Sequence, residues 1–324
     1  MFGAMKEGLS RHRIMGINAR NRDYILPNNA RRNYPLVDDK LLTKQLAIEA
    51  GIPVPELYGV IEFISQAGKV AEIAHPHRQF AIKPCRGSGG GGIVVVKNVF
   101  GSSFQKMSGE IVSAPDMQYH VTNMLSGMYS LKSATDRVIL EYAVKFDPIF
   151  DEITYQGVPD IRIIVYKGVP VMAMLRLPTR KSDGKANLHK GGIGVGIRMH
   201  DGVTMYGVQG RTFVNEHPET LHTLSGRQIP NWPQLLEMAS KFYDIVGLGY
   251  VGVDIVLDRD KGPMVLEANA RPGIAIQIAN RRGLLSRTEK VDATDISAFK
   301  MADRIDFALN AYKGEIGNDL PFAG

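Results

Sequence analysis

The stretch VGVDIVLDRDKGPMVLEANARPG, residues 251–273, carries acidic and amide side chains inside two apolar, strand-like runs. Glu267 and Asn269 stand two positions apart, so they point to one face of a strand, and Asp254 on the preceding run can lie opposite them. Burying carboxylates in apolar strands is costly unless a cation or hydrogen bonds offset the lost hydration. Oxygen ligands of this kind suit Mg²⁺, so the pattern predicts a metal site of Asp254, Glu267 and Asn269. The alternative is structural, with Asp254 capping a turn and Glu267 paired with Arg271.

A second segment, AIKPCRGSGGGGIVVV at residues 81–96, joins two apolar runs through a lysine and a glycine-rich loop. Glycines accept positive φ and let backbone N–H groups approach a phosphate closely, and the lysine adds a positive charge. The residues expected to bind nucleotide here are Lys83, Ser88, Gly89, Gly90 and Gly91. The loop fits neither a Walker loop nor a dinucleotide-binding turn. A glycine-rich hairpin turn beside an unrelated lysine is the alternative interpretation.

Composition narrows the class of protein. Hydrophobic residues make up 44% and charged residues 22% of the 324-residue chain, which is typical of a globular protein. The sequence has neither an apolar run long enough to span a membrane nor a secretory signal, so we expect no membrane span. The single cysteine, Cys85, excludes an internal disulfide and a cysteine-based zinc site, and it favours a reducing, cytoplasmic location. A net charge of +6 suits anionic ligands and does not by itself indicate nucleic acid, so no nucleic-acid partner is expected.

Local patterns outline the elements around these segments. They predict a helix from a cap at Asp38 or Asp39 to Gly51, a hairpin of DIRIIVYKG and VPVMAMLRL about Lys167 and Gly168, a helix over Trp232–Val246 and helical periodicity over Asp295–Tyr312. We expect three regions. These are a basic N-terminal arm at 1–35, a small subdomain with the glycine-rich loop at 36–135, and a large subdomain with the metal site and a C-terminal helix at 136–324.

The N-terminal arm is basic and rich in turns. Its arginines are Arg11, Arg13, Arg20, Arg22, Arg31 and Arg32. One interpretation is a solvated arm, and the other is a lid or a docking element for an acidic partner.

Three arginines, Arg162, Arg176 and Arg271, stand on or beside apolar strand segments. An arginine ordinarily lies on the surface. Because these three accompany a predicted metal site, we expect their guanidiniums to gather around a phosphate or a carboxylate. The loop NLHKGG, residues 187–192, adds amide, imidazole and ammonium groups, and His189 is a candidate general base.

Taken together, these residues resemble the ATP-grasp superfamily and, within it, the RimK-type and α-L-glutamate ligase-like proteins. The resemblance covers residues 37–283 and rests on DDKLLTKQLAIEAGIPVPE, AIKPCRGSGGGG, ILEYAV, DIRIIV, MLRLPTR, NLHKGG, GVDIV and LEANARPG. It implies phosphate contacts for Lys40, Lys83 and Lys190, adenine contacts for Glu141, Tyr142 and Val144, and a ribose contact for Asp147. It also implies substrate and phosphate contacts for Arg162, Arg176, Arg271 and Asn187.

The resemblance implies an α+β fold in which two subdomains clasp ATP. Ligases of this type usually begin with an α/β preATP domain, whereas only 36 residues precede the entry helix here, so we expect the fold to lack a full preATP domain. The acceptor site would then be completed by the basic arm, by a subgroup-specific insertion at residues 206–232, or by a partner chain. Ala270 and Arg271 replace a small-residue pair of the RimK-type enzymes, so the resemblance does not extend to their amino-acid specificity.

The implied activity is an ATP-dependent carboxylate–amine ligase that uses Mg²⁺ or Mn²⁺ and forms an amide bond through an acyl phosphate. Glutamate or a similar amino acid would be one substrate and a peptide or protein the other, with a homo-oligomer as a further expectation. Two other classes stay open at this point: a kinase-like phosphotransferase, and a noncatalytic ATP-binding subunit of a complex.

Overall fold

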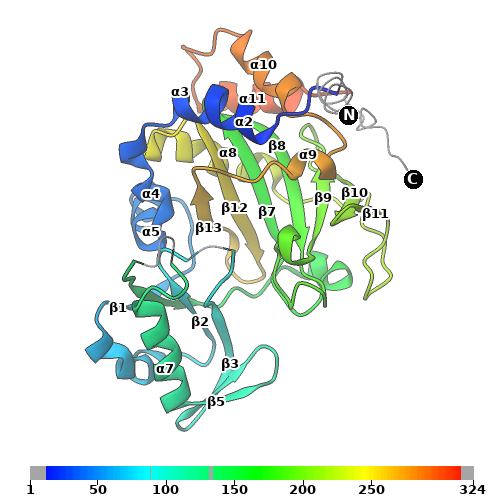
Figure 1. Ribbon diagram of the computed structural model, residues 1–324. Helices are drawn as coiled ribbons and strands as arrows, with labels where there is room; N and C mark the ends of the chain where they lie inside the picture. The colour runs from blue at the N-terminus through cyan, green and yellow to red at the C-terminus, as the bar shows by residue number, and fades with distance from the viewer. Residues whose placement is uncertain (1–11, 88, 131–133, 315–324) are drawn as a thin grey trace. The chain divides into compact units, whose positions relative to one another are not determined.

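The computed structural model describes residues 12–87, 89–130 and 134–314, so Ser88 and the first eleven residues of the expected arm lie outside it. The chain forms two compact units, each built on one antiparallel sheet (Figure 1). The small unit is Asp38–Lys145, and the large unit combines Met1–Val37 with Phe146–Gly324.

The small unit holds a six-stranded sheet in the order β1-β6-β2-β3-β4-β5. Its strands are β1 Leu57–Ile61, β2 Phe80–Pro84, β3 Val94–Phe100, β4 Ser103–Lys106, β5 Ile111–Ser113 and β6 Val138–Tyr142. Its helices are α5 Lys40–Glu49, the 3-10 helix η3 Ile64–Lys69, α6 Val70–Ala74 and α7 Ala114–Leu125. Helix α7 packs on β4, β5 and β6, where Met117, Val121 and Met124 join the core of the sheet.

Capping fixes the entry helix α5 at the predicted place. The buried carboxylate of Asp39 accepts hydrogen bonds from the N–H groups of Leu41 and Leu42, at 3.1 and 3.4 Å. These bonds satisfy donors that have no partner within the helix. Gly51 follows the helix with a φ of +69°, which favours glycine, so the predicted start and end are both confirmed.

The large unit holds a seven-stranded sheet in the order β11-β10-β9-β8-β7-β12-β13. Its strands are β7 Asp160–Tyr166, β8 Val169–Leu177, β9 Ile193–Ile197, β10 Thr204–Gln209, β11 Thr212–Val214, β12 Tyr250–Asp258 and β13 Gly262–Asn269. The helices after Phe146 are η5 Pro148–Ile153, η6 Leu188–Lys190, α8 Trp232–Val246, α9 Ile276–Ala279, α10 Leu285–Asp292 and α11 Met301–Asn310. Helix α8 packs on β7, β8 and β12, and α11 packs on α8 and β8, so these helices and strands form the core of the unit.

The predicted hairpin of β7 and β8 and the predicted helix α8 are confirmed. The C-terminal helix α11 is shorter than expected. The carboxylate of Asp295 instead accepts from the N–H and hydroxyl of Ser297, which forms a local turn, and the helix begins only after Lys300.

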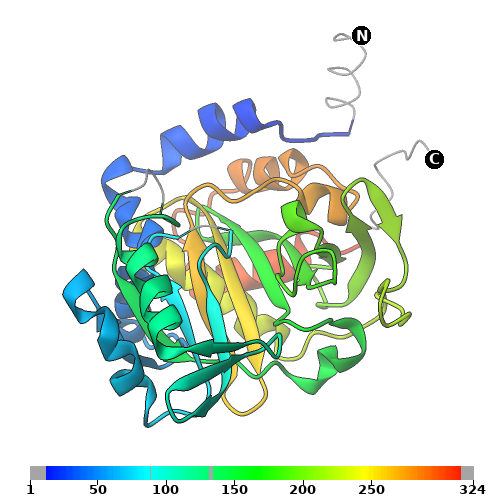
Figure 2. The same cartoon turned by 60° about the horizontal axis from the view of Figure 1, so that its bottom comes forward.

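The N-terminal segment, residues 12–37, is part of the large unit. It consists of short helical turns: α2 Ile17–Ala19, η1 Arg20–Ile25, α3 Leu26–Asn28, η2 Arg31–Asn33 and α4 Pro35–Asp38. Figure 2 shows this segment in blue beside the orange C-terminal helices. Met15 is fully buried and exchanges hydrogen bonds with the side chain of Gln277. The described part of the expected arm is therefore anchored to the large unit at Met15.

We expect Asn29→Ala to destabilise the large unit by about 1–3 kcal/mol, because buried backbone groups lose their partners. Asn29 is buried, accepts from the N–H of Tyr250 at 2.8 Å and donates to its carbonyl at 2.8 Å. The chain has one tryptophan, Trp232, which is buried in this unit, so its fluorescence during urea unfolding reports on the large unit.

The matched control for this experiment is Asn18→Ala, at an exposed position of the same segment. It should shift the free energy of unfolding by less than about 0.5 kcal/mol. Equal effects of the two variants would mean that the segment does not pack on the large unit.

Candidate active site

A row of charged side chains crosses four adjacent strands of the large sheet. Strand pairing sets Asp160 opposite Arg176 between β7 and β8, and Arg162 opposite Asp254 between β7 and β12. The next strand, β13, sets Glu267 opposite Asp254. Opposite residues in a sheet point to the same face, so the register brings together residues that are far apart in the chain.

Asp254 contacts both arginines of the row. Its side chain is 1% exposed and accepts from Arg162 at 2.7 and 2.6 Å. Arg176 donates to the same carboxylate at 2.6 Å and makes a two-point contact with Asp160 at 2.5 and 2.8 Å. Arg162 and Arg176 thus gather around carboxylates, and in this structure the carboxylates are the protein's own.

Burial and charge have opposite effects on the two carboxylates. Burial alone would raise the pKa of Asp254, but the adjacent Arg162 and Arg176 guanidiniums hold this pKa well below its usual range. Burial raises the pKa of Asp160; the charge of Arg176 opposes this shift, and that of Asp254 adds to it. Asp254 is therefore the carboxylate held firmly in its ionised form.

Glu267 and Asn269 complete the set predicted for a metal. They lie two apart on β13, and the Asn269 amide donates to Glu267 at 3.4 Å, so the two side chains share a face. Among the described residues no group of three or more histidine, cysteine, aspartate and glutamate side chains is arranged for a metal. The set has two carboxylates with an amide oxygen as the third donor, and hard oxygen donors of this number fit Mg²⁺ with phosphate and water completing its shell.

The other predicted residues of the large unit lie outside this row. The guanidinium of Arg271 lies 4.8 Å from the ring centre of Tyr34. Asn187 accepts from the N–H of His189 at 2.9 Å and caps η6, while His189 and Lys190 are exposed on that turn. The structure describes no contact that gives His189 the orientation of a general base.

In the small unit, a buried carboxylate lies between two lysines. Glu141 on β6 is 4% exposed at its side chain and is ion-paired with Lys83 on β2 and with Lys44 on α5, the latter at 2.9 Å. Burial alone would raise the pKa of Glu141, but the charges of Lys83 and Lys44 hold it below its usual value. Burial lowers the pKa of Lys44, against the opposing charge of Glu141. The carboxylate that was expected to face adenine thus faces two ammonium groups here.

The glycine-rich loop begins directly after β2. Gly89, Gly90 and Gly92 have φ values of +60°, +72° and +74°, which side chains other than glycine rarely adopt. The Lys40 ammonium donates to the carbonyl of Gly87 at 2.7 Å, so the entry helix contacts the base of the loop. The glycines therefore allow the backbone conformations that close contact between the loop and a phosphate would require.

The segment predicted to contact adenine and ribose is the connection between the two units. Tyr142 ends β6 and its N–H donates to the carbonyl of Glu56 at 2.8 Å, and Val144 follows just before the unit boundary. Asp147 begins the next element in the large unit, where its carboxylate accepts from the N–H of Ile149 at 2.9 Å. The adenine and ribose roles stay predictions.

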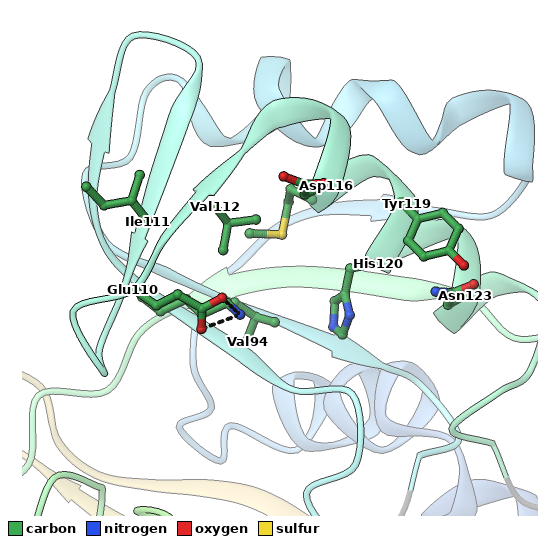
Figure 3. Close-up of a pocket in the computed structure, with 10 residues that line it drawn as sticks. Val94, Glu110, Ile111, Val112, Asp116, Tyr119, His120 and Asn123 are labelled. Atoms are coloured by element: carbon green, nitrogen blue, oxygen red, sulfur yellow. Dashed lines mark hydrogen bonds and ion pairs between the residues drawn. The ribbon is translucent and has the colours of Figure 1, made fainter.

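A separate cavity of about 270 Å³ lies in the small unit between β3–β5 and α7 (Figure 3). Its lining includes Lys106, Glu110 and His120, and none of the candidate nucleotide-binding residues. The His120 ring is 2.9 Å from the carbonyl oxygen of Gly92. This contact joins α7 to the end of the glycine-rich loop, although the cavity itself is distinct from the predicted site.

Two residues of these clusters were not predicted from the sequence. Lys44 lies one helical turn after Lys40, and this i, i+4 spacing was the available signal. Asp160 lies two positions before Arg162, so strand alternation places both on one face. The partner of Lys44, Glu141, lies on the distant strand β6, whereas Asp160 pairs with Arg176 on the neighbouring strand of the same hairpin.

We expect Lys44→Met to destabilise the small unit by about 1–3 kcal/mol at neutral pH, because Glu141 stays buried with one cation fewer. Hydrogen exchange of the amides of β6, measured by mass spectrometry, would report on this unit. Lys69→Met, at an exposed position, should have little effect and serves as the control.

The same pair predicts a pH dependence. Since the folded-state pKa of Glu141 is lowered, its contribution to stability is present above the unfolded value and is lost as the pH falls through the folded value. The small unit should therefore become less stable below about pH 4.5. The decline should be shallower in Lys44→Met, and an identical decline in both proteins would contradict the buried pair.

Several solved structures resemble the chain at low identity. The ATP-grasp ligase PsnB with a minimal precursor is 14% identical, with a TM-score of 0.44 over 82% of this chain and 62% of PsnB, so the chain spans less than two thirds of that ligase. D-cycloserine synthetase DcsG is 16% identical, with a TM-score of 0.45 over 79% of this chain and 70% of its own. The RimK domain protein ATP-grasp from Sphaerobacter thermophilus is 15% identical, with a TM-score of 0.41 over 86% and 70%. No curated protein matches the chain.

The family described as sugar-transfer associated ATP-grasp matches residues 19–293. This range covers most of the chain and includes both sheets described above. The expected ATP-grasp superfamily and the α+β fold class with two subdomains are confirmed. No helix in the described part of the chain is long and apolar enough to cross a membrane. The chain belongs to the sugar-transfer associated ATP-grasp family.

Proposed function

We propose that the protein is an ATP-dependent carboxylate–amine ligase that forms ADP and an amide through an acyl phosphate. The observation that carries this proposal is the register of β12 and β13 in a member of the ATP-grasp family. That register sets Asp254 opposite Glu267, with Asn269 on the same strand face. Two carboxylates and an amide on one face are a donor set for the cation that accompanies ATP.

The large unit would bind the charged end of the nucleotide. Asp254, Glu267 and Asn269 would hold Mg²⁺ or Mn²⁺, which when bound would neutralise charge on the β- and γ-phosphates. Arg162 and Arg176 already contact Asp254, so their guanidiniums are fixed beside the place where phosphate oxygens would lie. Fixed donors of this kind stabilise developing negative charge without first having to reorganise.

The small unit would bind phosphates from its own side. Lys83 and the backbone of Gly89, Gly90 and Gly91 are the candidate contacts, together with Lys40 at the base of the loop. Glu141 holds the Lys83 ammonium by a charged hydrogen bond, which limits the directions in which it can point. ATP should stabilise each unit that contacts it, and this stabilisation can be measured for each unit separately.

In the proposed reaction a substrate carboxylate attacks the γ-phosphate and releases ADP. An amine then attacks the acyl carbon, and phosphate leaves through a tetrahedral intermediate. Arg176 and Arg271 would stabilise the acyl phosphate and the oxyanion, Asn187 and Lys190 would contact phosphate or substrate, and His189 would act as a base. An amino acid such as glutamate is proposed as one substrate and a peptide or protein as the other. Because the family is described as associated with sugar transfer, amino sugars and uronic acids belong among the compounds to be tested.

Hydroxylamine should trap the acyl phosphate as a hydroxamate when the correct acid, ATP and Mg²⁺ are present. The trap reacts in place of the natural amine, so the experiment identifies the acid alone. The acids to be screened are amino acids, short peptides and uronic acids, with ADP release measured in parallel and products identified by mass spectrometry. A stable phosphorylated product without hydroxamate would show a phosphotransferase. Nucleotide binding without turnover across the whole screen would favour a noncatalytic subunit.

We expect Glu267→Gln to lower turnover by about 100-fold or more, because the change keeps the size of the side chain and removes one ligand charge. ADP formation at saturating ATP and Mg²⁺ measures the effect, and the urea midpoint from Trp232 fluorescence should stay close to that of the wild type. Glu237→Gln, on the exposed side of α8, is the matched control and should keep full activity. Near-normal turnover of Glu267→Gln would remove Glu267 from the metal site.

A further inference from the structure

The loop that follows β13 is held on both sides of Arg271 by the N-terminal segment. Asn29 donates to the carbonyl of Ala270 at 3.3 Å, and Arg20 donates to the carbonyl of Pro272 at 2.7 Å. Both Arg20 and Asn29 are buried. The backbone immediately before and after Arg271 is therefore fixed by residues about 250 positions earlier in the chain.

The strand under this loop leaves it little room to move. A Cβ at Gly252 on β12 would lie 2.6 Å from the Cβ of Pro272, so the loop packs directly on the strand backbone. This close approach is consistent with a rigid turn after Asn269. Since the backbone of Arg271 is already held, a contact that orients its side chain does so by restricting the side-chain torsion angles.

An aromatic ring of the same segment meets the Arg271 side chain. Tyr34 is 9% exposed, and its ring centre lies 4.8 Å from the guanidinium carbon of Arg271, while Arg271 is exposed. An aromatic face attracts a guanidinium through its quadrupole and stacks against its plane. The buried ring therefore gives the exposed Arg271 side chain an attractive contact that favours one orientation.

A second guanidinium, that of Arg20, is another positive charge near the contact between Tyr34 and Arg271. Burial is the main cause that lowers the pKa of Arg20, Tyr250 raises this pKa, and the positive charge of Arg271 makes a smaller lowering contribution. Two guanidiniums near one short loop repel each other. The face of Tyr34 provides an attractive contact on the Arg271 side that offsets this repulsion.

We propose that Tyr34 is a positioning residue that aims Arg271 at the reacting groups, and that the N-terminal segment thereby contributes to the candidate active site. The proposal rests on the proposed ligase function, in which Arg271 stabilises the acyl phosphate and the oxyanion. It gives the basic segment a role within the large unit, through an aromatic ring and two hydrogen-bond donors. An arginine that acts on a transition state loses much of its effect when it is displaced or mobile.

The test compares Tyr34→Leu with Tyr34→Phe. Phenylalanine keeps the aromatic face and leucine keeps only an apolar side chain, so the pair separates ring stacking from simple packing. We expect Tyr34→Leu to lower kcat by about 3- to 30-fold, with the KM for ATP changed less than twofold, and Tyr34→Phe to stay close to the wild type. Equal kcat values for Leu and Phe variants would overturn the proposal.

A double-mutant cycle excludes a merely structural effect. In an Arg271→Met background, Tyr34→Leu should cause no further loss of kcat, because the side chain that it positions is absent. The full 3- to 30-fold loss in that background would mean that Tyr34 acts through folding, and would overturn the proposal. Trp232 fluorescence in urea measures how far each variant is destabilised.

A measurement without turnover keeps this proposal separate from the ligase assignment. The Nε–H signal of Arg271, identified by its loss in Arg271→Lys, should be shifted by the ring of Tyr34 in ¹⁵N-resolved NMR spectra. The shift should persist in Tyr34→Phe and disappear in Tyr34→Leu. An inactive wild type that shows this shift would contradict the ligase while keeping the contact, and an active wild type without it would contradict the contact alone.

Discussion

The pairing of β12 with β13 is the constraint on which the candidate site depends. The register changes between Asp254 and Ile255, so the ladder has an irregularity next to the carboxylate itself. A slip by one residue would turn Glu267 and Asn269 to the opposite face and separate them from Asp254. The short turn at Asp258–Gly262, with Gly262 at a φ of +73°, holds the two strands in this alignment. Because β12 is buried along its whole length, a different register would also place polar groups in the core.

Both units solve the same electrostatic problem in the same way. Each buries a carboxylate between two cations: Asp254 lies between two guanidiniums in the large unit, and Glu141 lies between two ammonium groups in the small unit. A carboxylate buried without cations or hydrogen-bond donors would become neutral or would destabilise the fold around it. These ion pairs also fix the positions of the positively charged groups, so that a second anion could bind beside them. Planar guanidiniums can contact two anions at once, which is why the pairs in the large unit suit phosphate oxygens better than single-point ammonium groups would.

Local sequence signals were sufficient to predict several elements of the fold. The glycine and lysine of the turn predicted the hairpin of β7 and β8, and apolar periodicity predicted α8, because neighbouring residues alone determine these patterns. The metal-binding hypothesis could be reached in the same way, since Glu267 and Asn269 alternate on one strand. The roles of Lys44 and Asp160 could not be predicted in this way. Lys44 pairs with Glu141, which is nearly a hundred residues away in the chain. Asp160 pairs with Arg176 through a strand register that the sequence does not show. Charge alone was also not enough to predict the surroundings of Arg162 and Arg176, which contact internal carboxylates.

The N-terminal segment illustrates why composition is a poor guide to the role of a charged stretch. A high content of arginine suggests a solvated segment when every arginine is treated alike. In the folded chain, Arg20 is buried and donates to a backbone carbonyl, whereas Arg22 is exposed and pairs with the adjacent Asp23. An arginine of the first kind holds the segment in place, because its long apolar stem packs while its guanidinium satisfies a buried acceptor. Asn29 and Tyr34 act beside it although neither is charged. The segment is attached by three different side-chain chemistries that meet at one loop, and it is this convergence that gives it a place beside the candidate active site.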